Sequence, residues 1–370
     1  MTKLHDLYYE QGQSPWLDNL RRGWLTGGEL TRWVERGIRG ITSNPTILQK
    51  AIAGSTEYDD QFGALAHRGD VTTTDAYWTM VVADIEAALR ILRPVHDESD
   101  GVDGFVSLEV APALARDRAG TVAAARELHD RIAEPNLFVK VPATAEGVDA
   151  IRTLVGEGRN INVTLIFGLD RYDAVMEAYI GGLEAYGGDL STVTSVASFF
   201  VSRVDTEVDQ RLEAIGTDEA LALRGRAAVA QAQVAYGRFL AKFSGPRWQA
   251  LAERGARVQR PLWASTSTKN HAYRDTLYVD DLIGPDTVNT MPEVTLDAFD
   301  DHGSLARTVD ADPEAAQATL DAIGAVGVDL DDVSRVLEDQ GVATFAKSFD
   351  ELVSALDAKA DDLRSGAAAQ

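Results

Sequence analysis

Short apolar or β-branched runs alternate with longer stretches of helical periodicity along the chain, and this alternation strongly limits its possible folds. We interpret eight runs as strands, at about residues 15–18, 40–44, 104–110, 136–142, 161–167, 193–198, 261–265 and 287–290. Strands that alternate with helices are typical of a parallel sheet. Eight such units predict a (β/α)8 TIM barrel with additional helices, and an open doubly wound sheet is the alternative.

No linker rich in glycine and proline divides the chain, so a single barrel domain is expected over residues 1–370. Residues 203–254 are predicted to form a long helical insertion with an alanine-rich middle. The last residues, RSGAAAQ at 364–370, are predicted to be a disordered tail.

Lys140 lies in the otherwise apolar run NLFVKVP at residues 136–142. An ammonium buried in such a strand is costly unless it is paired or has lost its proton. In a barrel, Lys140 and Phe138 would face inward, because the opposite face packs against helices. A neutral amine attacks carbonyl groups and forms Schiff bases, so Lys140 is a candidate nucleophile. The competing interpretation is a structural lysine that pairs with a carboxylate or extends to solvent.

Polar residues occur near the carboxyl ends of the other runs. They are Asp18, Asn44, Glu109, Asn162, Thr164, Ser198, Ser265 and Asn289. Active sites of barrel enzymes are built at this edge, so these side chains are expected to converge with Lys140. Simpler interpretations are a helix N-cap for Asp18, a structural ion pair with Lys140 for Glu109, and a turn before Pro45 for Asn44.

Composition excludes several classes of function. The chain has 35 Lys+Arg and 58 Asp+Glu, and a net charge of −23 argues against nucleic acid and anionic membranes as partners. It has no cysteine, and its N-terminus lacks the apolar core of a signal peptide, which fits a cytoplasmic location. No apolar stretch approaches the roughly 18 residues of a membrane span. The histidines are scattered without ligand spacing, so no metal site is expected.

Four segments resemble the signature segments of transaldolase. They are ITSNPT at 41–46, VSLEV at 106–110, LFVKVPAT at 137–144 and INVTLIF at 161–167. Three later segments resemble the longer, monofunctional subfamily of actinobacteria and plants: WASTSTKN at 263–270, DTLYV at 275–279 and TVNTMP at 287–292. The resemblance extends from about residue 10 to residue 365.

The resemblance implies a cofactor-free transferase of the non-oxidative pentose phosphate pathway. Such an enzyme moves a dihydroxyacetone unit from sedoheptulose 7-phosphate or fructose 6-phosphate to glyceraldehyde 3-phosphate or erythrose 4-phosphate. Its implied partners are therefore sugar-phosphate substrates, and the chain is expected to be a monomer or a homodimer. Two alternatives are a Schiff-base aldolase that cleaves fructose 6-phosphate without transfer, and a barrel that binds sugar phosphates without turnover.

The resemblance also implies a role for each matching residue. Lys140 matches the Schiff-base lysine, Glu109 the acid that acts through a water, and Asp18 the base that takes the C4 hydroxyl proton. The remaining matches are Thr164 for positioning the water, Asn44 and Asn162 for the dihydroxyacetone hydroxyls, Ser198 and Ser265 for substrate, and Arg203 for phosphate.

One segment departs from the family pattern. Shorter transaldolases have a second phosphate-binding arginine shortly after the serine that Ser265 matches, whereas here the sequence reads TSTK at 266–269. Lys269 is the expected substitute, although its alignment is shifted by one residue. We also hypothesise that Phe200 lines the site and protects the enamine by offering no proton.

Overall fold

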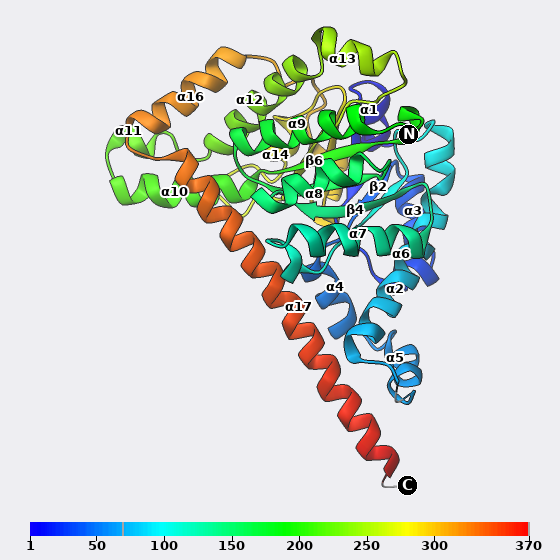
Figure 1. Cartoon of the computed structure of the whole chain (residues 1–370). Helices are drawn as coiled ribbons and strands as arrows, with labels where there is room; N and C mark the ends of the chain where they lie inside the picture. Colours follow the sequence, from blue (N-terminus) through cyan, green and yellow to red (C-terminus); the bar gives the residue numbers. More distant parts are fainter. Residues whose placement is uncertain (69, 369–370) are drawn as a thin grey trace.

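The computed structural model describes residues 1–68 and 70–368 and contains a closed parallel barrel (Figure 1). The strands follow one another around the barrel in chain order, and β1 pairs with β8 to close it. They are β1 Gln13–Leu17, β2 Gly40–Thr42, β3 Phe105–Glu109, β4 Leu137–Pro142, β5 Ile161–Ile166, β6 Ser195–Phe200, β7 Arg260–Ala264 and β8 Thr287–Met291. The predicted TIM barrel is therefore confirmed and the open doubly wound sheet is wrong. The single-domain organisation stays a prediction.

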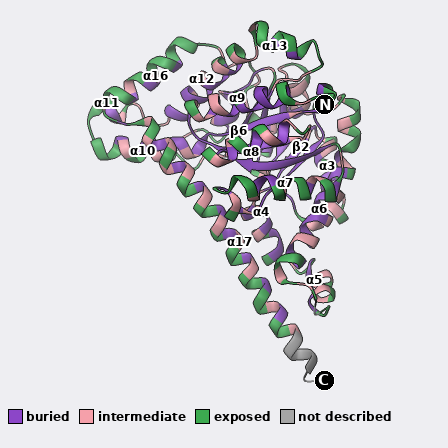
Figure 2. Cartoon of the chain, viewed as in Figure 1, coloured by how far each residue is buried: buried purple, intermediate pink, exposed green. Residues whose placement is uncertain are grey.

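Helices surround the barrel, and Figure 2 shows buried strands beneath helices whose outer faces are exposed. Those before β6 are α1 Lys3–Tyr9, α2 Arg22–Thr26, α3 Glu29–Glu35, α4 Pro45–Ala53, α5 Asp59–Ala66, α6 Thr73–Glu98, α7 Arg118–Ile132, α8 Ala145–Val155 and α9 Leu169–Ala185, with short 3-10 turns at Pro112–Leu114 and Leu190–Thr192. Those after β6 are α10 Ser202–Ile215, α11 Asp218–Leu221, α12 Ala227–Lys242, α13 Gly245–Ala252, α14 Leu277–Asp280, α15 Glu293–His302, α16 Pro313–Ala325 and α17 Leu330–Ala368.

The interior of the barrel is filled below the strand ends by aromatic rings. Phe138 stacks on Phe105 with ring centroids 4.1 Å apart and lies 6.2 Å from Trp16. β2 contains Gly40 at this level, because a Cβ there would come within 2.3 Å of the Trp16 ring. Phe138 thus faces the barrel interior, and Lys140, two residues later on the same strand, faces inward above it.

A buried charge network closes the amino-terminal end of the barrel. Asp103 accepts hydrogen bonds from Ser14 Oγ at 2.7 Å and Trp16 Nε1 at 3.1 Å, and pairs with Arg39 at 2.9 Å and Arg260 at 3.0 Å. Burial alone would raise the pKa of Asp103, but the two guanidinium groups hold it below its ordinary value. The network joins β1 and β7 to residues that lie just before β2 and β3.

The expected insertion at 203–254 divides into α10, α11, α12 and α13. The sixth strand also differs from its predicted range of 193–198. Val193 ends a turn by donating to Leu190, whereas Phe199 and Phe200 continue the pairing with β7 opposite Trp263 and Ala264. The strand therefore begins later and carries Phe200 to the barrel mouth.

The long helix α17 crosses the carboxyl-terminal side of the barrel and continues past α4 toward α5 (Figure 1). Ser334 Oγ donates to the Phe167 carbonyl at 3.1 Å, and Ser348 Oγ lies 2.8 Å from Thr46 Oγ1. The helix extends through Ala368 and so reaches into the segment 364–370 that the sequence predicts to be disordered; positions 369–370 lie outside the described residues.

Among the described residues, no helix combines the length and the apolar character needed to cross a membrane. The same residues contain no group of three or more histidine, cysteine or acidic side chains that could hold a metal ion.

Candidate active site

A cavity of about 180 Å³ opens at the carboxyl ends of the strands. It brings together most of the side chains that the sequence analysis singled out. Its lining consists of Asp18, Thr42, Asn44, Lys140, Thr164, Ser198, Phe200, Arg203, Ala264, Ser265, Thr266, Ser267, Lys269, Thr290, Pro292 and Phe345. Glu109 and Asn162 are absent from this lining and contact lining residues from behind.

Lys140 has two polar partners inside the barrel. Its Nζ donates to the Ser43 carbonyl at 2.8 Å and lies 3.3 Å from Glu109 Oε2. The two side chains are only 5% and 3% exposed, so the interpretation in which Lys140 extends to solvent is wrong. The ion pair offsets the cost of burial, while the cavity leaves the amine open to a small ligand.

Glu109 is a buried carboxyl beside that amine. Burial raises its pKa, and the positive charges of Lys140 and Arg203 only partly oppose the shift. A carboxyl with a raised pKa takes up and returns a proton more readily near neutral pH. Glu109 therefore suits proton transfer at a group held by Lys140.

Thr164 presents a free hydroxyl to the cavity. It is fully buried, and its Oγ1 has no hydrogen-bond partner among the described residues. It stands just before Leu165, which has a φ of +59° where the pairing of β5 with β6 shifts register. An unpaired buried hydroxyl is costly, so a water or substrate group is the natural partner for Thr164.

Asp18 lies on the opposite side of the cavity from β4 and β5, after β1. It accepts a 2.6 Å hydrogen bond from Thr42 Oγ1, and α2 begins at a different N-cap, Arg21. The helix N-cap interpretation of Asp18 is therefore wrong. Burial raises its pKa, while the Thr42 hydrogen bond and the charges of Lys140, Arg203 and Lys269 oppose the shift. Asp18 is thus suited to act as a base near neutral pH.

The two predicted amides differ in how their atoms are used. Asn44 caps α4, because its Oδ1 accepts from Ile47 N at 2.9 Å, which leaves its Nδ2 for a ligand. The turn interpretation is thus partly right, but Asn44 also lines the cavity. Asn162 Nδ2 donates to Ser107 Oγ at 3.0 Å, and its Oδ1 accepts from Ser198 Oγ at 2.7 Å.

Two cations lie at the outer end of the cavity. Burial lowers the pKa of Arg203, and the charges of Asp18 and Glu109 oppose this at longer range. Burial likewise lowers the pKa of Lys269, and Arg203 and Lys50 lower it further by repulsion. Lys269 Nζ contacts Ser267 Oγ. Because the cations repel each other here, the arrangement favours an anionic ligand.

Ser265 begins the loop that carries Lys269. Its φ is +56°, in the left-handed region, and its Oγ lies 2.9 Å from Ser202 Oγ, next to Arg203 in the sequence. The backbone N–H of Ser202 also donates to the Ser265 carbonyl at 3.1 Å. These contacts hold the loop after β7 against the start of α10.

Asn289 was expected to converge with Lys140 at the carboxyl ends of the strands, and this prediction is wrong. Its Nδ2 donates to the Tyr278 carbonyl at 3.1 Å, outside the barrel, whereas the next residue, Thr290, contacts Thr42 and lines the cavity. Side chains alternate along a strand, so the choice of phase decides which residue faces inward. Sequence reasoning also missed Phe345, because its helix carries no motif that points to the barrel mouth.

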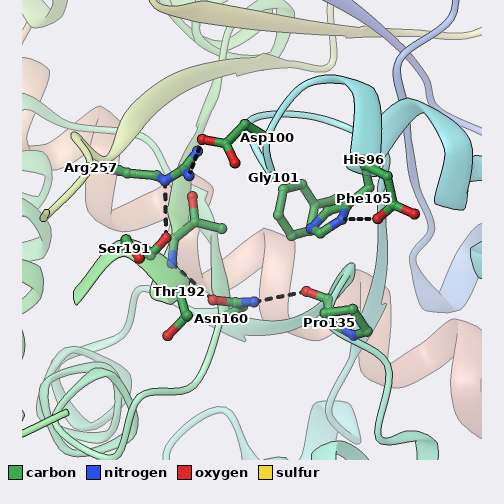
Figure 3. A pocket seen from close by; sticks show the side chains of 11 residues that line it. His96, Asp100, Gly101, Phe105, Pro135, Asn160, Ser191, Thr192 and Arg257 are labelled. Carbon is green, nitrogen blue, oxygen red and sulfur yellow. Dashed lines mark hydrogen bonds and ion pairs between the residues drawn. The ribbon is translucent and has the colours of Figure 1, made fainter. Parts of the chain in front are cut away.

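A second cavity, of about 360 Å³, lies at the opposite end of the barrel, where the strands begin (Figure 3). Arg257 there pairs with Asp100 at 3.3 Å and donates to the Ser191 carbonyl at 3.1 Å. Asn160 donates to the Pro135 carbonyl at 3.1 Å. None of the predicted site residues lines this cavity, so the predicted chemistry belongs to the carboxyl-terminal end.

Comparison with known proteins identifies the family of the chain. The model of the transaldolase/fructose-6-phosphate aldolase family matches residues 15–356. A transaldolase of Thermobifida fusca is 52% identical over 93% of this chain and 95% of its own length. Transaldolases of Frankia alni and Mycolicibacterium smegmatis are 51% and 50% identical, over 93% and 95% of this chain and 94% and 95% of their own lengths. The chain therefore belongs to the transaldolase/fructose-6-phosphate aldolase family.

Proposed function

We propose that this protein is a transaldolase, which transfers a dihydroxyacetone unit between sugar phosphates through a Schiff base on Lys140. The observation that carries the proposal is the position of the Lys140 amine, buried beside Glu109 and open to a cavity with cations at its outer end. The relatives named transaldolase, about 50% identical over nearly the whole chain, support the same reaction.

The reaction begins when the unprotonated Lys140 amine attacks the C2 carbonyl of a ketose phosphate. Glu109, acting through a water held by Thr164, supplies the proton with which the C2 oxygen leaves as water. The product is a protonated imine, which accepts an electron pair readily. The imine thus makes an external cofactor unnecessary for the next step.

Asp18 then removes the proton of the C4 hydroxyl group. The C3–C4 bond breaks, its electron pair moves toward the imine nitrogen, and an aldose phosphate leaves. Three carbons remain on Lys140 as an enamine, held at their hydroxyls by Asn44 and by the Asn162–Ser198 pair. An acceptor aldose is attacked by the enamine, its new hydroxyl takes the proton from Asp18, and hydrolysis releases the product.

The phosphate group lies at the other end of the substrate, where Arg203 and Lys269 provide the positive charge. In this orientation, the reacting carbonyl would lie deep in the barrel and the phosphate group would lie near the rim. We propose sedoheptulose 7-phosphate and fructose 6-phosphate as donors, and glyceraldehyde 3-phosphate and erythrose 4-phosphate as acceptors. The proposal retains the cytoplasmic location and the monomeric or homodimeric state expected from the sequence.

Borohydride trapping tests the proposal directly. With fructose 6-phosphate and borohydride, a peptide containing Lys140 should gain a reduced three-carbon group, and Lys140→Ala should lose both the adduct and about three orders of magnitude or more in kcat. Lys347→Ala is the matched control, because Lys347 is 77% exposed on α17. An unmodified Lys140 peptide would instead favour the alternative in which the barrel binds sugar phosphates without turnover.

The aldolase alternative is tested by the acceptor. A transaldolase should consume fructose 6-phosphate rapidly only when an acceptor aldose such as erythrose 4-phosphate is present. Steady release of free dihydroxyacetone at the same rate without an acceptor would instead assign the chain to the aldolase branch of the family.

A further inference from the structure

Arg203 is held in the cavity by aromatic rings and not by carboxylates. Its guanidinium carbon lies 5.1 Å from the centre of the Phe200 ring and 5.9 Å from that of Phe345. Within the described part of the chain it makes no ion pair, in contrast to the barrel-floor arginines Arg39 and Arg260, which both pair with Asp103. Arg203 is therefore positioned by ring contacts that leave its N–H groups unused.

Phe345 reaches this position from α17, far from the other cavity residues in the sequence. It is 3% exposed and lines the cavity. One turn earlier, Gly341 packs so closely on β5 that a Cβ there would come 3.0 Å from Leu165 Cδ2. One turn later, Phe349 meets the Tyr77 ring edge-on at 5.2 Å. Residues four apart share a helix face, so Phe345 lies on the packed face of α17, and the close contact of Gly341 with β5 fixes its height.

We propose that Phe345 is a positioning residue that holds the Arg203 guanidinium for the phosphate group of the substrate, an inference that rests on the proposed function. Phe200 also contacts the guanidinium, so the cation lies near a ring from β6 and a ring from α17. Ring faces attract the cation without neutralising it, so its charge and its N–H donors stay available for a phosphate. A carboxylate in the place of Phe345 would hold Arg203 equally well but would repel the ligand.

Phe345→Leu tests the proposal, because leucine keeps apolar bulk but has no ring. From the usual strength of a cation–π contact, we expect KM for fructose 6-phosphate to rise about 3- to 30-fold with little change in kcat. Inorganic phosphate should inhibit the variant correspondingly more weakly. Turnover of the unphosphorylated donor fructose should change much less than turnover of fructose 6-phosphate, and Phe345→Tyr, which keeps the ring, should restore phosphate affinity.

Phe349→Leu is the matched control, since Phe349 lies on the same face of α17 but does not line the cavity. This variant should lose stability without selective loss of phosphate affinity. In an Arg203→Met background, Phe345→Leu should produce no further rise in KM for fructose 6-phosphate. The proposal is overturned if the two changes are additive, or if Phe345→Leu impairs fructose and fructose 6-phosphate equally.

Calorimetric titration with inorganic phosphate separates this proposal from the proposed function. If borohydride trapped no adduct on the wild-type protein, the proposed transaldolase function would be wrong. Weaker phosphate binding by Phe345→Leu than by Phe349→Leu would still support the role of the ring. Equal phosphate binding by the wild type and Phe345→Leu would refute that role, whatever the reaction.

Discussion

In the proposed mechanism, single side chains decide whether the three-carbon enamine survives until an acceptor arrives. Phe200 lines the cavity above Lys140 and packs on Phe167 with ring centroids 5.1 Å apart. A phenyl ring has no proton to give, so an enamine beside it is protected from protonation. We therefore propose that transfer depends on a side chain that performs no chemical step.

Phe200→Tyr should weaken this protection, because a phenol at the same place can protonate the enamine. Release of free dihydroxyacetone from fructose 6-phosphate without an acceptor should rise about tenfold or more, in the range typical of general acids. An enzyme-coupled assay for dihydroxyacetone measures the change. Phe167→Tyr, whose side chain does not line the cavity, should show no such gain. An unchanged release rate in Phe200→Tyr would remove the protective role.

Much of the cavity could be predicted at the scale of residues. Lys140 could be assigned to the barrel interior because Phe138 shares its face and a charge cannot lie beneath helices. Asn289 could not be assigned, since both faces of β8 carry polar side chains and the sequence does not indicate the phase. The position of Phe345 in the cavity could not be predicted either, because an aromatic residue on a helix is ordinarily interpreted as part of the core.

At the scale of elements, the cations at the cavity rim depend on contacts between α10 and the loop after β7. Arg203 lies in the first turn of α10, and Asp209 lies in a later turn of the same helix. Tyr273, in the loop that carries Lys269, donates to Asp209 at 2.5 Å. Thr268 Oγ1 donates to the Arg274 carbonyl at 2.8 Å and fixes the same loop internally. The Tyr273 hydroxyl, which lies outside the cavity, thus helps to set the spacing of Arg203 and Lys269.

Tyr273→Phe should loosen that loop while it leaves the reacting groups intact. The loss of a hydrogen bond to a carboxylate costs about 1.5–3 kcal/mol, part of which should appear as a severalfold rise in KM for fructose 6-phosphate with kcat retained. Steady-state kinetics measure both constants. Tyr236→Phe is the control, since its hydroxyl contacts the Pro285 carbonyl at 3.1 Å, away from the loop. A fall in stability with an unchanged KM would show that the contact is only structural.

At the scale of the whole molecule, the two ends of the barrel have different tasks. At the carboxyl-terminal end, Arg203 and Lys269 line a cavity and make no ion pair with the described residues. At the amino-terminal end, Asp103 lies in a fully paired network with Arg39 and Arg260. Removing one partner of a buried pair leaves an uncompensated charge, which is strongly destabilising. Stability and activity should therefore be separable by substitutions at opposite ends.

Asp103→Asn should destabilise the protein by about 3–5 kcal/mol and leave kcat unchanged at temperatures where the variant stays folded. Because the folded-state pKa of Asp103 is lowered, its contribution to stability is present above the ordinary pKa of 3.8 and is lost as the pH falls through the folded value. Urea unfolding at pH 7 and in this acid range should show a smaller pH dependence for the variant. Equal unfolding midpoints at pH 7 would contradict the role of the network.

The barrel itself could be predicted at this scale because strand and helix periodicities repeat in a regular order. The route of α17 could not, since periodicity identifies an apolar stripe but not the surface that covers it. The contact of Gly341 with Leu165 joins residues far apart in the sequence, and only the packed molecule defines it.

The position of α17 in the chain has a consequence for the order in which the enzyme is made. A ribosome synthesises all eight strands before it reaches Phe345, so the barrel can close while the Phe345 ring beside Arg203 is still missing. A nascent chain would then hold Lys140 in place but bind sugar phosphates weakly. Competence for phosphorylated substrates would be acquired late in synthesis, when the helix docks across the open mouth.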